Sequence, residues 1–220
     1  GHKDLTVVVA PDGHLNATVE LEQYLVGCDA VISALGHNLT FSGVFGAPKH
    51  LCSDTASIVC GLIKKLAPVK PIKFIVIGTE GVDRLDGSDP RRGFGERFLL
   101  TLLWLLLPPH ADNMEVMRVL RDEVTGTSNS ADSPRNPYVE FCVVRPSDLV
   151  DGEETAYTAH ENLQNGIFNA SRPSTRATVG RFMASLVTKP DVWQQWRNQF
   201  PHLLDCVKEA GAGAGAGAGD

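Results

Sequence analysis

The sequence predicts an α/β protein in which a parallel sheet is covered by helices on both faces. Three features of its 220 residues lead to this prediction. Short apolar runs rich in Val and Ile recur along the chain, stretches with apolar residues at helical spacing lie between them, and a turn or small residue follows each run. Such runs are typical of strands that are buried on both faces. Strands that alternate with helices form a parallel sheet between two helical layers.

Four strands are predicted from these runs. Each is short and nearly all apolar, and they cover residues 5–10, 30–35, 73–78 and 140–145. The first reads Leu-Thr-Val-Val-Val-Ala and the third Lys-Phe-Ile-Val-Ile-Gly. Neither shows the strict alternation of a half-exposed strand, so both favour burial within the sheet.

Helices are predicted where apolar side chains return to one face, over residues 18–26, 54–66, 113–123 and 178–187. The run at 98–107, Phe-Leu-Leu-Thr-Leu-Leu-Trp-Leu-Leu-Leu, is apolar all round and ends at two prolines. A membrane-spanning helix needs about 20 residues, so this run predicts a buried helix and no membrane anchor. Residues 125–137 are nearly all turn formers and predict a loop. The segment with Trp193 and Trp196 is expected to pack against the sheet edge.

The composition predicts one globular domain. Hydrophobic residues make up 43% of the chain and charged residues 21%, which is near the globular average. The formal net charge of −6 is opposite in sign to that of a nucleic-acid binder, so no nucleic-acid partner is expected. Residues 211–219 alternate Gly and Ala and cannot bury enough surface to stay ordered. We therefore predict a domain over residues 1–205 and a flexible tail over residues 206–220.

The five cysteines favour a reducing compartment. They are odd in number and widely spaced, and they form neither a Cys-x-x-Cys pair nor a Cys/His cluster with zinc spacing. The histidines likewise show no spacing typical of a metal site. These patterns predict reduced thiols, a cytoplasmic protein and no bound metal.

The candidate site consists of the residues that follow each predicted strand. In an open parallel sheet, ligands bind beyond the carboxyl ends of the strands. Small residues at those ends let a ligand approach the backbone closely. At the end of the second predicted strand these residues are Ser33, Ala34, Leu35 and Gly36. At the end of the third they are Gly78 and Thr79, and at the end of the fourth Arg145, Pro146, Ser147 and Asp148.

Three stretches, taken in order, resemble a known family. They are Gly-Cys-Asp-Ala-Val-Ile-Ser-Ala-Leu-Gly at 27–36, Phe-Ile-Val-Ile-Gly-Thr-Glu-Gly-Val at 74–82 and Val-Val-Arg-Pro at 143–146. Their order and spacing are similar to those of the atypical short-chain dehydrogenase/reductases of the NAD(P)H-binding, NmrA-like group. The stretch at 93–113 is similar to a bacterial and fungal subgroup of that family, and the resemblance extends over roughly residues 5–200.

This resemblance implies a Rossmann-like fold that holds NADP or NAD across the strand ends. It further implies an oxidoreductase that acts on a small carbonyl, quinone or flavin-like substrate. The ribose and pyrophosphate would lie beside Ser33, Ala34, Leu35 and Gly36, and the nicotinamide near Thr79, Pro146, Ser147 and Asp148. The cofactor-binding set is completed by Asp12, Gly78 and Arg145, of which Arg145 could pair with a cofactor phosphate.

The sequence departs from the family in two ways. The family opens with a strand, a glycine-rich turn and a helix, whose backbone N–H groups hold the pyrophosphate. Aligned on the resemblance, this chain begins at the third strand of the family, so an N-terminally truncated domain is expected. Standard members also use a Tyr-x-x-x-Lys pair for proton exchange, whereas the three tyrosines here are followed four residues later by Cys28, Cys142 and Glu161. Hydride transfer itself needs mainly a correctly positioned cofactor.

Thr79 and His110 are the catalytic candidates. Thr79 stands at the serine position of the family, where it could hydrogen-bond a carbonyl substrate or instead cap a turn or helix. His110 precedes Asp112, so a carboxylate could orient its imidazole for acid–base chemistry, or His110 could cap the next helix. For Arg145 the alternative is a structural ion pair at the strand end.

Two other functions stay open on the sequence alone. One is a non-catalytic regulator that senses the nicotinamide state, as the resemblance to NmrA-like proteins implies, and the other is a truncated member that binds no cofactor. Without the first strand of the family, residues 5–10 should either pair with residues 30–35 or peel away from the sheet. An apolar sheet edge left open in this way invites self-association.

Overall fold

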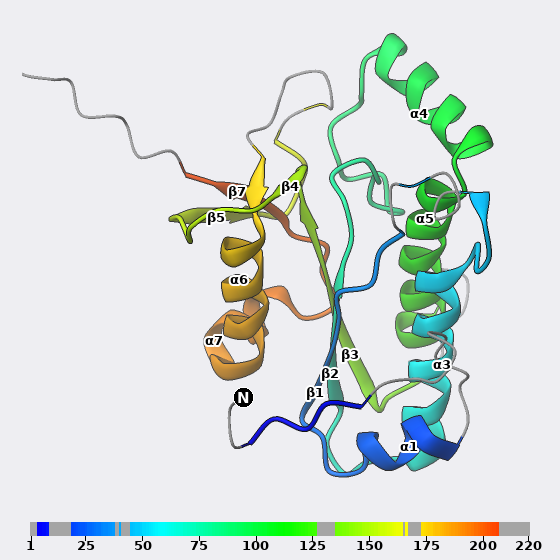
Figure 1. Cartoon of the computed structure of the whole chain (residues 1–220), viewed down its shortest axis with the longest axis vertical. Coiled ribbons are helices and arrows are strands. Elements are labelled where there is room, and N and C mark those ends of the chain that lie inside the picture. Colours follow the sequence, from blue (N-terminus) through cyan, green and yellow to red (C-terminus); the bar gives the residue numbers. More distant parts are fainter. Residues whose placement is uncertain are drawn as a thin grey trace, which may run out of the picture.

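A five-stranded sheet forms the centre of the molecule, with the order β1-β2-β3-β7-β5 (Figure 1). The computed structural model describes residues 4–8, 19–37, 40, 45–126, 135–164, 166 and 173–206. The strands are β1 (Ala30–Ser33), β2 (Ile72–Ile77), β3 (Val139–Pro146), β7 (His202–Asp205) and β5 (Tyr157–His160). The first four run parallel, and β5 runs antiparallel to β7.

Helices cover both faces of this sheet (Figure 1). One layer contains α1 (Val19–Leu25), α3 (Leu51–Leu66) and α5 (Pro108–Leu120), which continues into the π-helical turn η1 (Arg121–Thr125). The opposite layer contains α6 (Arg176–Thr188) and α7 (Pro190–Trp196). The α/β fold with a mostly parallel sheet between helices is thus confirmed.

Successive side chains of the central strands point to opposite faces of the sheet, so the core is divided into two clusters. Phe74 and Val76 of β2 pack in the cluster that includes α3 and α5, whereas Ile75 packs in the cluster that includes α6 and α7. The register places Phe74 beside Phe141 and Ile75 beside Cys142, so β3 repeats the same division. Because both faces are covered, the strands carry apolar residues in succession.

Three of the four predicted strands are present, and the first is not. Residues 5–8 form no strand, and Leu5, Val7 and Val8 are exposed; residues 9–10 lie outside the described part. The sheet therefore ends at β1, which has no strand beyond it among the described residues. Ile32 on this edge strand is 48% exposed. Residues 5–8 thus do not form the predicted strand.

The helix predicted at 98–107 is longer than expected and is not buried. It is α4 (Phe94–Leu106), and Glu96 is its only buried residue. Figure 1 shows α4 projecting from the body of the protein beyond the end of α5. Phe98, Leu105 and Leu106 are more than half exposed. An apolar sequence on all sides of the helix therefore did not indicate burial. The turn at Leu107 directs α4 outward, and α5 is the element against which it mainly packs. Among the described residues, no helix is long and apolar enough to cross a membrane.

The sequence patterns missed the short strands of the second half. These are β5 and β7 in the main sheet, and β4 (Leu149–Val150) and β6 (Ser174–Thr175), which pair in a small sheet of their own. Each has two to four residues, too few to show a period. Trp193 and Trp196 are buried with residues of β2, β3 and β7, so they pack on the face of the sheet and not at its edge.

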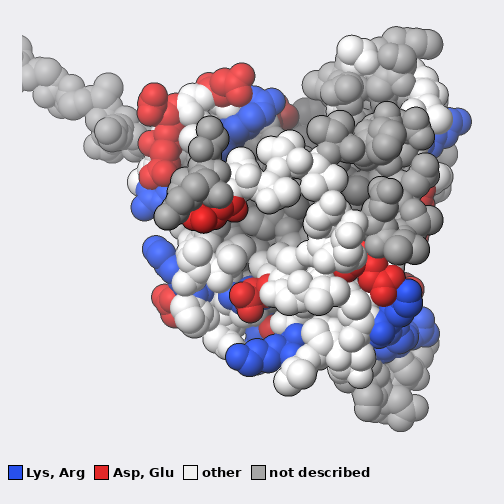
Figure 2. Space-filling model, turned by 60° about the horizontal axis from the view of Figure 1, so that its bottom comes forward, with Lys and Arg blue, Asp and Glu red and all other residues white. Residues whose placement is uncertain are grey.

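Two predicted segments lie largely outside the described residues. These are the loop at 125–137, of which 127–134 are not described, and the tail, of which only Cys206 is described. Cys206 donates its N–H to the carbonyl of Ala156. On the face shown in Figure 2, basic and acidic side chains lie beside one another around a broad area of uncharged residues.

Candidate functional site

The carboxyl ends of β1, β2 and β3 meet at one edge of the sheet. The register aligns Ser33 with Val76 and Ile77 with Val144, so all three strands end at nearly the same level. Ser33 is buried at the end of β1, while Ala34 and Gly36 after it are exposed. A Cβ at Gly36 would meet no atom of the described residues within 4 Å. Of the predicted cofactor residues at the first strand end, Ala34 and Gly36 are therefore exposed, whereas Ser33 is buried and Leu35 packs against the core.

The turn after β2 is bound tightly to β3. Gly78 donates its N–H to the carbonyl of Val144 at 2.7 Å, and Glu80 donates its N–H to the carbonyl of Pro146 at 3.0 Å. A Cβ at Gly78 would lie 2.9 Å from Cγ1 of Val143, closer than real Cβ contacts allow. Glycine at this position lets the chain cross close to β3. The predicted residue Gly78 thus shapes the strand end through its lack of a side chain.

Thr79 caps the same turn. Its hydroxyl oxygen accepts the N–H of Gly81 at 3.2 Å, and its carbonyl accepts the N–H of Val82 at 3.2 Å. This is the capping role given above as the alternative to catalysis. Because a hydroxyl has one donor and two acceptor positions, the proton of Thr79 remains available to a ligand.

The structure brings Thr79 and His110 to the same place. Oγ1 of Thr79 and Cε1 of His110 lie 3.6 Å and 3.7 Å from the position that a Cβ would take at Gly81. His110 belongs to the first turn of α5 and donates its backbone N–H to the carbonyl of Leu107. Burial, together with the charge of Arg92, lowers the pKa of His110, against a smaller opposing effect of Asp83. The imidazole is therefore neutral at neutral pH.

Asp112 does not orient His110, which corrects the pairing expected from their closeness in sequence. Its carboxylate is fully buried and accepts the backbone N–H groups of Cys52 and Ser53 at the start of α3. It also accepts hydrogen bonds from the hydroxyl of Ser53 and from Nε2 of His37, the latter at 2.9 Å. Burial raises the pKa of Asp112, but these hydrogen bonds outweigh it and hold the pKa below its usual range. Asp112 thus caps α3 as an anion.

The same cluster contains a thiol. The Sγ of Cys52, Nε2 of His37 and a carboxylate oxygen of Asp112 lie within 4.8 Å of one another, a grouping that no sequence spacing indicated. Burial, with the added effect of Asp112, raises the pKa of Cys52 to about 12. The thiol is therefore protonated, and both carboxylate oxygens of Asp112 already accept two hydrogen bonds each. Helix capping accounts for the cluster.

Arg145 has protein partners in place of the expected cofactor phosphate. It is fully buried, and its guanidinium forms two hydrogen bonds with the carboxylate of Asp89, at 2.6 Å and 3.3 Å. Its other N–H groups reach the carbonyls of Phe200, Val82 and Glu161. This is the structural ion pair named above as the alternative. Arg145 fixes the loop that follows β2 to the end of β3.

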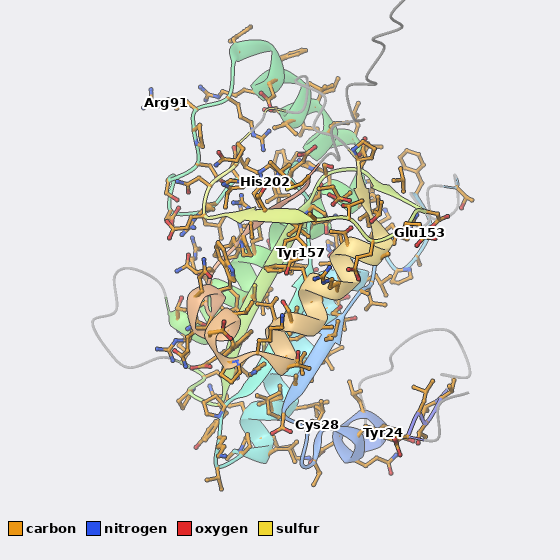
Figure 3. All side chains as sticks on the ribbon, turned by 90° about the vertical axis from the view of Figure 1, so that its left-hand side faces the viewer. Tyr24, Cys28, Arg91, Glu153, Tyr157 and His202 are labelled. Atoms are coloured by element: carbon orange, nitrogen blue, oxygen red, sulfur yellow. The ribbon has the colours of Figure 1, made fainter. Side chains whose placement is uncertain are left out.

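Two further polar contacts hold the strand ends. His202 accepts the N–H of Gln164 at Nδ1, so the proton resides on Nε2, which donates to Glu80 at 3.2 Å. Figure 3 labels His202, which is fully buried at the start of β7. The hydroxyl of Ser147 lies 3.4 Å from that of Ser174, whose N–H donates to the carbonyl of Asp148. Glu80 and His202 were missed by sequence reasoning, because 122 residues separate them.

A pocket of about 510 Å³ opens beside Gly81 and His110. Its walls come from the loop after β2, from α4 and from α5. Among its lining residues only His110 was predicted as a site residue, because the others carry no catalytic motif and converge only in the folded chain. The lining residues that matter below are Leu85, Arg92, Arg97, Leu100, Trp104 and Met114. Asp12, the one remaining predicted cofactor residue, lies outside the described residues.

No protein-family model matches the chain, and no curated protein matches it. Two solved structures share its fold. One is a short-chain dehydrogenase/reductase of the wide type from Veillonella parvula in complex with NADP, with a TM-score of 0.54, 15% identity and coverage of 87% of this chain and 69% of that one. The other is a candidate NADH-flavin reductase from Streptococcus pneumoniae, with a TM-score of 0.51, 17% identity and coverage of 84% and 75%. Both likenesses support a Rossmann-like fold for this chain.

Proposed function

We propose that this protein is an NAD(P)-binding oxidoreductase related to the atypical, NmrA-like short-chain dehydrogenase/reductases. One observation carries the proposal: at the strand-end edge, Thr79 of the turn after β2 lies beside Gly81, and His110 lies beside the same glycine and lines a pocket with it. Ligands of open α/β sheets bind at such an edge. Two proteins that share the fold add support, since one is bound to NADP and the other is a candidate NADH-flavin reductase.

The cofactor would lie along the carboxyl ends of β1 to β3. The exposed residues Ala34 and Gly36 would face the ribose and pyrophosphate, and no atom within the described ranges lies in the space beside Gly36. The segment from Pro146 to Asp148, held by β6 and by Glu80, would border the nicotinamide. A bound nicotinamide would supply the hydride. Arg145 would act as a positioning residue that keeps these segments together.

Thr79 and His110 would serve the substrate. The free hydroxyl proton of Thr79 can donate to a developing oxyanion on a small carbonyl or quinone. A neutral His110 can donate a hydrogen bond through one ring nitrogen and accept one through the other. Neither role needs the Tyr-x-x-x-Lys pair that the sequence lacks.

Cofactor binding is tested first by thermal unfolding with NADPH and with NADH. A ligand that binds only the folded chain adds about 2.7 kcal/mol at a concentration one hundred times its Kd, which raises the Tm by several degrees. We expect such a shift with at least one nucleotide. No shift with either nucleotide would contradict the proposal. A shift without oxidation of NADPH by any quinone or aldehyde would favour the nicotinamide-sensing regulator over the enzyme.

Thr79 is tested by comparing Thr79→Val with Thr79→Ser in NADPH oxidation by a probe quinone. We expect Thr79→Val to lower kcat/KM by about tenfold or more and Thr79→Ser to restore most of it, because only the hydroxyl donor is removed. Both variants should keep the nucleotide-induced Tm shift. Equal activity in the two variants would exclude Thr79 from the reaction.

A further inference from the structure

The pocket beside Gly81 has an apolar interior and a charged rim. Leu85, Leu100, Trp104 and Met114 supply apolar surface from three separate segments. Trp104 is 46% exposed, so part of its indole surface is open to a ligand. A volume of about 510 Å³ matches the size of sites that bind small organic molecules.

Arginine dominates the rim, but most of these arginines already have partners. Arg92 pairs with Asp83 and Glu96, and Arg84 pairs with Asp86. Arg118 lies 3.5 Å from Glu115 on the same helix. These three guanidiniums are thus largely neutralised within the protein.

Arg97 is different from the other arginines of the rim. It is exposed, and within the described ranges its guanidinium forms no ion pair or side-chain hydrogen bond. It lines the pocket and also a second, polar cavity of about 500 Å³, which shares Arg92 with the first. Arg97 therefore offers an uncompensated positive charge where the apolar pocket meets the polar cavity.

We propose that this pocket binds a ligand with an aromatic ring and an anionic group, with Arg97 as the counter-ion. The ring would lie against Trp104, Leu100 and Met114, and the carboxylate or phosphate would reach the junction at Arg97. A guanidinium binds either anion through two parallel N–H groups, which a neutral polar group cannot match. Aromatic rings pack favourably on an indole. Bound in this way, the ring shares the pocket with His110.

The inference names the substrate class of the proposed enzyme and in that respect rests on the proposed function. Its test needs no cofactor, so the two can fail separately. We would titrate 2-naphthoate, 2-naphthyl phosphate and the neutral 2-naphthamide into the whole chain by calorimetry without nucleotide. We expect at least one anion to bind about tenfold or more tighter than 2-naphthamide, because a charge-assisted hydrogen bond is lost with the amide. The ratio of the two anions distinguishes a carboxylate ligand from a phosphate ligand.

Arg97→Gln is the decisive variant, with Arg91→Gln as its matched control. Both side chains are exposed, but Arg91 lines only the polar cavity and points away from the body of the protein (Figure 3). We expect Arg97→Gln to abolish the preference for the anion and Arg91→Gln to keep it. Trp104→Leu should weaken binding of all three probes without changing their ranking.

Several results would overturn the inference. Equal affinity for anion and amide, or no binding of any probe, would show that the pocket has no anion site. If Arg97→Gln and Arg91→Gln lost the preference for the anion equally, the preference would depend on net charge and not on the position of Arg97. Thermal unfolding of each variant confirms that it folds. A nucleotide-induced Tm shift beside a failed titration would leave the proposed function standing while the ligand class is rejected.

Discussion

At the scale of single residues, Gly78 illustrates how the strand-end edge is built. Its missing side chain lets the turn after β2 approach Val143, and a Cβ there would come within 2.9 Å of Cγ1. We expect Gly78→Ala to lower the free energy of unfolding by about 1–3 kcal/mol, because β3 is buried and cannot move aside. Chemical denaturation measures this effect.

Gly61→Ala is the matched control for Gly78→Ala. Gly61 lies within α3, and a Cβ there would meet no atom within 4 Å. The substitution should raise the free energy of unfolding by about 0.5–1 kcal/mol, since alanine favours a helix interior more than glycine does. If both alanine variants were equally stable, the close approach at Gly78 would be refuted.

His110 predicts a specific pH dependence of stability. Its pKa is lowered in the folded protein by burial and by Arg92. The folded state therefore takes up the proton less readily than the unfolded chain, and the stability due to neutral His110 is complete above about pH 6.5 and declines as the pH falls below it. We expect His110→Asn to lose less stability than the parent between about pH 7 and pH 5. Parallel pH profiles of Tm in the two proteins would argue against a buried, neutral His110.

Residue types at the strand ends could be predicted from the sequence, but their partners could not. Ser33, Gly78 and Thr79 follow apolar runs, and a parallel sheet brings such positions to one edge. Arg145 was recognised as a choice between phosphate and ion pair, and the structure supplies Asp89 as the partner. Asp89 lies 56 residues away in a turn-rich segment that carries no periodic signal. Long-range pairing of this kind depends on the folded chain.

At the scale of elements, the start of α3 depends on a residue from another helix. His50 at the N-cap makes no side-chain hydrogen bond, and Asp112 of α5 accepts the free N–H groups in its place. We expect Asp112→Ala to lower the free energy of unfolding by about 3 kcal/mol, because it leaves several buried donors without an acceptor. Urea unfolding measures the loss.

Asp122→Ala serves as the control for Asp112→Ala. Asp122 pairs with Arg121 at the surface, where both side chains are more than a third exposed. Exposed ion pairs contribute about 0–1 kcal/mol, so little change is expected. An equally small effect of Asp112→Ala would contradict its role as the cap of α3.

The helices were predictable because their apolar residues recur at helical spacing, and the central strands because they are continuous apolar runs. α3, α5 and α6 extend beyond the predicted ranges by a few residues, since helix ends depend on caps supplied by other segments. For α4, the apolar run correctly predicted a helix, but the prediction that this helix is buried was wrong. Periodicity describes a segment, whereas burial depends on what packs against it.

At the scale of the whole molecule, the sheet combines a closed centre with an open edge. β2 and β3 are covered on both faces and paired along their length, while β1 ends the sheet on one side among the described residues. We propose that this exposed edge permits self-association. Sedimentation velocity over a range of concentrations tests it, and a monomer at all concentrations would exclude it.

We propose that the ends of β1 to β3 bind a nicotinamide dinucleotide, and calorimetric titration of NADPH and NADH measures this binding. Three forms would be compared: the parent chain, Gly36→Glu at the strand-end edge and Gly180→Glu on α6, where both glycines are exposed and have open space for a side chain. A carboxylate at position 36 would face the pyrophosphate, so the account predicts a Kd at least about tenfold weaker for Gly36→Glu and unchanged binding for Gly180→Glu. Absence of binding in the parent, or equal binding in all three forms, would contradict dinucleotide binding at these strand ends.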